Sequence, residues 1–213
     1  MTDQEAQPDV RGPAAREALR WQYFTIGYNA VECAIAVTAG IGAGSVALVG
    51  FGADAGIELV AALLIVIRLR SAIRRGTVDQ RKEQRALKFV ATTFFALAAF
   101  LTVEAIRELT SDVKPGTSII GIVLTALSIL IMPWLATVKH KLGVAMNYRL
   151  LVADAAETRL CAWLSVTTFT GLLGYAALGW TWIDALAGLV IAGLAVKEGH
   201  TAWTGALTWR TSA

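Results

Sequence analysis

Residues 115–138 read PGTSIIGIVLTALSILIMPWLATV and contain no charged side chain. A helix of about 20 apolar residues crosses the hydrocarbon core of a bilayer, so this run is long enough for one membrane span. It does not alternate between apolar and polar residues, which argues against a strand of a membrane barrel. Two comparable charge-free runs lie at 33–53 and 160–183. The sequence therefore predicts a helical membrane protein.

The composition of the whole chain agrees with these runs. Of its 213 residues, 56% are hydrophobic and only 16% are charged, whereas soluble domains have about 25% charged residues. This balance argues against a soluble enzyme, a nucleic-acid-binding domain and a disordered chain. We expect an all-α integral membrane protein, a six-transmembrane-helix bundle with spans at about 21–41, 45–68, 87–107, 117–138, 152–178 and 182–200.

The basic residues predict the orientation of these spans. All 19 lysines and arginines except Arg107 and Lys114 fall on one side of the predicted topology, and such a bias marks the cytoplasmic side. We therefore expect a multi-pass protein of the plasma or inner membrane, with both termini cytoplasmic. Residues 1–20 and 201–213 would be short cytoplasmic tails, and 21–200 the transmembrane domain. The same bias accounts for the net charge of +3 without a nucleic-acid partner.

Acidic residues inside two of the spans are the main candidates for function. Carboxylates are costly in lipid, so an acid within a span is a functional hypothesis by default. Asp54 and Glu58 are four residues apart, which places them on one face of a helix. Asp154, Glu157 and Cys161 follow a spacing of three and then four residues, and they also share a face. Two such helices can converge on one metal ion.

Three further residues, and one of the acids above, are possible accessory ligands. Asn29, Glu32 and Cys33 lie within one turn of the first span. Three of these four have a simpler alternative: Cys33 as a small apolar residue, Glu32 as a buried hydrogen-bonding group, and Asp154 as a cap of the fifth span. Both cysteines, Cys33 and Cys161, lie inside predicted spans, so the sequence does not predict a disulfide framework of the secreted type.

The donor types suggest which metal would bind. Carboxylate oxygen and cysteine sulfur are both zinc ligands, whereas Mg²⁺ and Ca²⁺ prefer oxygen alone. One sulfur favours borderline-soft metals. We expect Zn²⁺, with Cd²⁺, Co²⁺ and Fe²⁺ as further candidates.

Three stretches resemble the cation diffusion facilitator superfamily. Residues 44–59, GSVALVGFGADAGIEL, are similar to its span-two region, and residues 153–165, ADAAETRLCAWLS, resemble its span-five signature. Residues 179–199, GWTWIDALAGLVIAGLAVKEG, resemble the opening and ending of its sixth span. The resemblance covers about residues 20–200. It implies a cation-efflux type of bundle, cytoplasmic termini and a homodimer, in the short form that lacks the family's C-terminal cytoplasmic domain.

The resemblance also assigns the four ligand positions. Asp54 and Glu58 stand at the two span-two positions. Glu157 stands where the family usually has a histidine, and Cys161 stands where it has a second aspartate. Because a histidine is lost and a thiol is gained, the preferred metal and the proton coupling are not carried over from the family.

These residues lead to a functional prediction. We expect a secondary transporter that exports a divalent metal in exchange for protons by alternating access, without a resident cofactor. Buried acids hold protons when the site is empty, and a metal that binds must displace them. A non-transporting membrane metal sensor or regulatory subunit is the alternative. We find no hydrolase constellation of residues, so an intramembrane enzyme is not expected.

Overall fold

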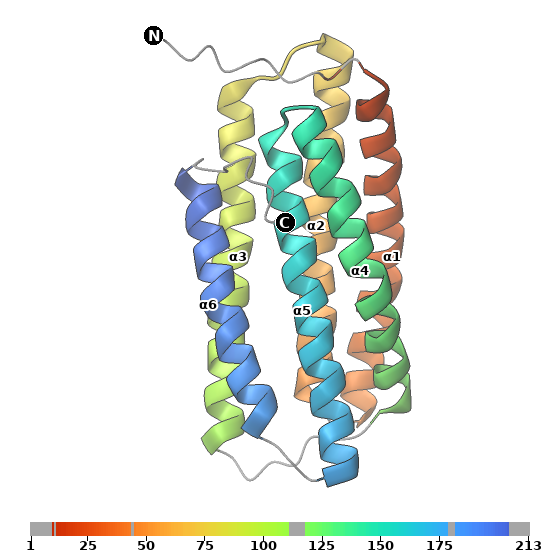
Figure 1. The fold of residues 1–213 in the computed structure, drawn as a ribbon, viewed down its shortest axis with the longest axis vertical. Coiled ribbons are helices and arrows are strands. Elements are labelled where there is room, and N and C mark those ends of the chain that lie inside the picture. Colours follow the sequence, from red (N-terminus) through yellow and green to blue (C-terminus); the bar gives the residue numbers. More distant parts are fainter. Residues whose placement is uncertain (1–9, 11, 44, 111–117, 179–181, 205–213) are drawn as a thin grey trace.

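The computed structural model describes residues 10, 12–43, 45–110, 118–178 and 182–204, and this part of the chain forms six helices and no strand. Their bounds are α1 Pro13–Ala43, α2 Val46–Arg75, α3 Gln80–Thr110, α4 Ile119–Ala145, α5 Arg149–Leu178 and α6 Trp182–Thr204. The predicted all-α six-helix bundle is confirmed. The helices alternate in direction, so the start of α1, the turns after α2 and α4, and the end of α6 lie toward one end (Figure 1).

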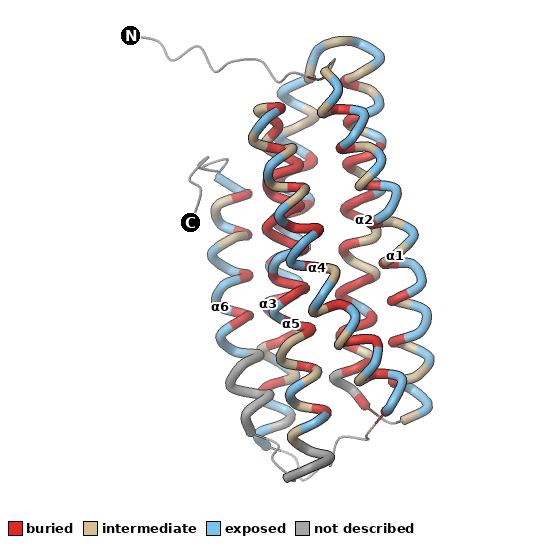
Figure 2. The backbone as a smooth tube through the Cα atoms, turned by 45° about the vertical axis from the view of Figure 1, so that its right-hand side comes forward, coloured by how far each residue is buried: buried red, intermediate tan, exposed pale blue. Residues whose placement is uncertain are grey.

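The outer surface of the bundle is apolar. Ile41, Ile119 and Leu130 are each at least 70% exposed, and exposed residues recur along the helices (Figure 2). Large apolar side chains exposed on all six helices mark a surface made for lipid. Within the described residues, four helices, α1 to α4, are long and apolar enough to cross a membrane.

The helices pack as a group of four with a flanking pair. α2 packs against α1 and α5, α4 packs against α5 and α1, and the four helices together enclose a common interior. α3 and α6 pack mainly against each other and lie beside α2 and α5 (Figure 1). This arrangement places α2 and α5, the two helices with the predicted ligands, next to each other.

Local sequence signals explain where the helices begin and end. Ser45 caps α2 by accepting the Leu48 N–H at 3.3 Å. At its other end Gly76 adopts a left-handed φ of 71°, which glycine reaches without strain. Asp79 then accepts the Lys82 N–H at 3.2 Å at the start of α3, and this hydrogen bond lowers the pKa of the Asp79 carboxyl group.

The connection between α4 and α5 is shorter than predicted. The predicted spans left residues 139–151 as a cytoplasmic connection, but α4 continues to Ala145 and α5 begins at Arg149. Asn147, with a φ of 51°, allows the tight turn because asparagine tolerates the left-handed region. The assignment of Lys139 to a loop is therefore wrong, and the residue lies inside α4.

Candidate metal site

The four predicted ligands are all buried, and they come from the two adjacent helices. Asp54 and Glu58 of α2 are 4% and 1% exposed, and Glu157 and Cys161 of α5 are 4% and 1% exposed. The spacing in sequence explains this, because residues four apart lie one above the other on a helix. Since α2 packs against α5, both acidic faces lie in the interior of the bundle.

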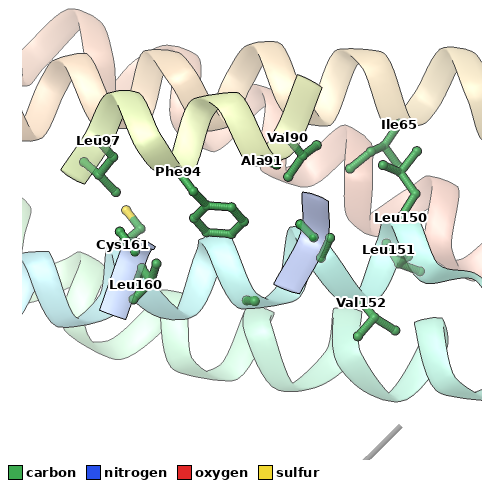
Figure 3. Close-up of a cluster of buried hydrophobic side chains, with 14 of the residues drawn as sticks. Ile65, Val90, Ala91, Phe94, Leu97, Leu150, Leu151, Val152, Leu160 and Cys161 are labelled. Atoms are coloured by element: carbon green, nitrogen blue, oxygen red, sulfur yellow. The ribbon is translucent and has the colours of Figure 1, made fainter. Parts of the chain in front are cut away.

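Asp54 and Cys161 are neighbours from the two helices. The Cys161 thiol and the Asp54 carboxyl group lie within interaction range of each other across the contact of α2 and α5. Apolar side chains surround the sulfur on the other side, and Figure 3 shows Phe94 and Leu97 of α3 beside it. The structure therefore brings together one oxygen and one sulfur donor of the predicted set.

Glu58 is bound to a lysine. The Lys139 ammonium of α4 lies 3.3 Å from Glu58 Oε1 and 2.9 Å from Asp154 Oδ2. It also donates to the Thr158 hydroxyl at 2.8 Å, and Thr158 in turn donates to Glu58. All of these side chains are almost completely buried. The three N–H donors of the ammonium thus meet three acceptors.

Lys139 could not be identified as part of the site from the sequence patterns described above. It stands next to His140 and Lys141 in a basic run that is typical of a cytoplasmic loop. The helical period contained the missing signal, because the buried residues Ser128, Met132, Leu135 and Lys139 of α4 are spaced by four, three and four. Lys139 continues that stripe and is 0% exposed.

Glu157 is held from a third helix. Thr93 of α3 donates to Glu157 Oε1 at 3.0 Å. Glu157 is also within electrostatic range of Glu58, Asp154 and Asp54. Four carboxyl groups therefore share one buried region with a single lysine that contacts two of them. Such a concentration of negative charge in an apolar bundle needs compensation by cations or protons.

Each of these four carboxyl groups uses at most one of its oxygens within the described part of the protein. In Glu58, Asp154 and Glu157, one oxygen accepts from a hydroxyl or from the lysine, as described above. One oxygen of each of the four groups is buried and has no hydrogen-bond partner in the described structure: Asp54 Oδ2, Glu58 Oε2, Asp154 Oδ1 and Glu157 Oε2. Buried polar atoms are usually paired, so four unpaired oxygens in one region require an explanation.

Glu32 and its neighbours form a polar group between α1 and α4, within electrostatic range of Asp54 and Glu58. Glu32 accepts hydrogen bonds from Ser128 and, at 3.2 Å, from Tyr28. Asn29 is fully buried, and neither atom of its amide has a partner in the described structure. Cys33 packs against α2 at Gly56, where an added Cβ would lie 3.3 Å from the sulfur.

Asp154 does not cap α5. The helix begins five residues earlier, at Arg149, and Asp154 is 0% exposed. Besides Lys139, it accepts a 2.6 Å hydrogen bond from Gln22 of α1. Asp154 therefore joins α1, α4 and α5 through one carboxylate oxygen.

The donors do not form a closed metal site in this arrangement. Among the described residues, no three His, Cys, Asp or Glu side chains surround a common point at metal-binding distance. Instead, the Lys139 ammonium lies between Glu58 and Asp154. Movement of side chains is needed before the four predicted ligands can share one ion.

The fold and the buried acids define a class of protein. Ionisable groups that face the interior of a membrane bundle mark ion pathways, and here they lie at the contact of α2 and α5. The family model described as the cation efflux transmembrane domain matches residues 24–204. The chain belongs to the cation diffusion facilitator family and is a multi-pass membrane transporter of metal cations. That family is one of transporters and not of enzymes. No curated protein matches the chain as a relative.

Proposed function

We propose that the protein exports Zn²⁺ and binds it with Asp54, Glu58, Glu157 and Cys161. One observation carries this proposal: the carboxyl groups on α2 and α5 are buried, and each keeps one oxygen without a partner among the described residues. A divalent cation would pair with those oxygens and offset their charge. The packing of α2 against α5 also brings Asp54 and Cys161 within interaction range of each other, which supports the proposal.

The donor set supports zinc as the main cargo. Zinc accepts carboxylate oxygen and thiolate sulfur in a four-coordinate site. The single sulfur also suits Cd²⁺. Co²⁺ and Fe²⁺ can bind the same oxygen and sulfur donors and are further candidates. Mn²⁺ prefers oxygen donors and should bind poorly.

Proton exchange follows from the charge of the site. The four carboxyl groups carry more negative charge than Lys139 offsets, so the site is most stable with bound protons or a cation. Metal that enters from the cytoplasm displaces those protons, since ligands bind in their deprotonated form. Rocking of the helices then exposes the site to the other side, where protons return and the metal leaves.

The remaining features of the proposal come from the family and the charge pattern. We place the protein in the plasma or inner membrane, with cytoplasmic tails at 1–20 and 201–213 around a transmembrane domain at 21–200. Resemblance to the family supports a homodimer with one site in each protomer.

Zinc flux in sealed vesicles tests the proposal. Purified protein is reconstituted, a pH gradient is applied, and zinc uptake is measured for Asp54→Asn and Glu58→Gln. Both variants should lose uptake, because an amide keeps the size of the side chain but not its charge. The control is Glu104→Gln, which removes only a surface ion pair with Arg107 at 3.9 Å and should transport normally.

Size-exclusion chromatography accompanies each measurement. Full uptake by Asp54→Asn would contradict the proposed site. A sensor or regulatory subunit, the alternative, would bind zinc in calorimetry and lose binding in Glu58→Gln, yet show no flux in the wild type.

A further inference from the structure

Lys139 contacts two carboxylates that differ in their proposed roles. Glu58 is a proposed metal ligand, and its Oε1 lies 3.3 Å from the ammonium. Asp154 is outside the proposed set of four, and its Oδ2 is closer, at 2.9 Å. Thr158 lies between them and bonds to both the lysine and Glu58. The ammonium therefore has a complete set of partners only while Glu58 is one of them.

A metal ion and the ammonium cannot share Glu58 without a large cost. Both are cations, and repulsion between buried charges is strong because little water screens them. Lys139 is 0% exposed and cannot turn toward solvent without repacking α4. The side chain must therefore withdraw within the bundle when a metal takes Glu58.

Asp154 can hold the Lys139 ammonium after it leaves Glu58. Gln22 fixes its Oδ2 from α1 with a 2.6 Å hydrogen bond. Its other oxygen, Oδ1, is buried and has no partner in the described structure. A buried lysine is strongly destabilising without a partner, and Asp154 supplies one that does not depend on Glu58.

We propose that Lys139 is a tethered cation that competes with the transported metal for Glu58, and that Asp154 holds its ammonium when the metal is bound. This inference rests on the proposed function, since it requires Glu58 to be a metal ligand. It assigns Asp154 to the lysine and not to the metal. The affinity of the site for metal is then set by the balance between the two carboxylates.

A double-mutant cycle on the full chain tests the inference, with Zn²⁺ binding measured by calorimetry. Lys139→Met should bind zinc about tenfold more tightly, and Asp154→Asn about tenfold more weakly, as expected for coupled neighbours. In the Lys139→Met background, Asp154→Asn should change the affinity by less than about twofold, because Asp154 acts through the lysine. The control is Lys141→Met, an exposed lysine on the same helix, which should leave the affinity unchanged.

Each alternative predicts a different result. If Asp154 binds the metal directly, Asp154→Asn weakens zinc binding equally in both backgrounds, and the inference is overturned. If Lys139 only stabilises the fold, Lys139→Met does not tighten binding, and the inference is overturned.

A second comparison applies if Lys139→Met alone does not fold. The double variant, which removes both charges, is then compared with Asp154→Asn, and equal zinc affinities would overturn the inference. Glu58→Gln separates the two proposals: unchanged zinc binding there removes the proposed function itself.

Discussion

Hydroxyl side chains orient the acids of the site. Thr93 donates to one oxygen of Glu157, and Thr158 donates to one oxygen of Glu58. Each threonine fixes one half of its carboxylate, and the second oxygen has no partner in the part of the chain that the structure describes. Small neutral donors suit this task, because a second lysine or arginine would neutralise the carboxylate that the metal needs.

Cys161 should determine which metals the site prefers. Replacement of Cys161 by serine is expected to lower cadmium affinity by about tenfold or more, because a hydroxyl is a poor ligand for soft metals. Zinc transport should be reduced but retained. Competition between Zn²⁺, Cd²⁺ and Mn²⁺ in calorimetry measures the change.

Cys33→Ser is the matched control for this prediction. Cys33 packs on Gly56 and is only partly buried, so its replacement should leave the order of metals unchanged. Equal cadmium affinity in Cys161→Ser and the wild type would exclude sulfur from the site.

At the scale of helices, close contact between α1 and α2 positions the α2 acids. Gly40 of α1 is buried where the α2 backbone passes. A Cβ built on it would lie 2.8 Å from the Val49 backbone nitrogen and 2.7 Å from the Val49 side chain. Only a residue without a side chain fits this contact, so the two helices depend on it for their spacing.

Gly40→Ala should therefore lower the stability of the bundle. The clash involves backbone, which cannot rotate away, and overpacking of this kind costs about 1–3 kcal/mol. Thermal unfolding of the purified protein in detergent measures the loss. Gly42→Ala, two residues further along α1, meets nothing within 4 Å and should leave the unfolding temperature unchanged. A similar loss in both variants would show that helix flexibility, and not packing, is responsible.

At the scale of the whole molecule, the alternating helices bring the two short turns to one end of the bundle (Figure 1). The basic residues around these turns predict that this end is cytoplasmic. The turn after α4 is shorter than the predicted connection, so fewer of its positions are exposed. Gly143 is buried inside α4, whereas Ala145 at the end of the helix is exposed.

Cysteine labelling tests this topology. A cysteine at the exposed positions Thr77 or Ala145 should react with an impermeant reagent only from the cytoplasmic side. A cysteine at residue 113, between α3 and α4, should react only from outside. The unmodified chain gives the background. Labelling of residue 113 from the cytoplasm would reverse the proposed direction of export.

Local patterns in the sequence were sufficient for the helices and the candidate ligands. Long charge-free runs predict spans because a backbone in lipid must satisfy its own hydrogen bonds. The described helices cover the predicted spans except for one residue before α2 and two before α4. The spacing of Asp54 and Glu58 predicts a shared face in the same way, since it depends only on the period of a helix. Both inferences use one helix at a time.

The role of Lys139 depends on other helices. Hydropathy treats every lysine as a residue that ends a span, and the neighbouring His140 and Lys141 strengthened that interpretation. Burial of an ammonium is tolerated only when carboxylates approach it, and these come from Glu58 on α2 and Asp154 on α5. Residues 81 and 15 positions away in the chain cannot be recognised as partners before the helices are packed. The charge balance of the site is therefore a property of the assembled bundle.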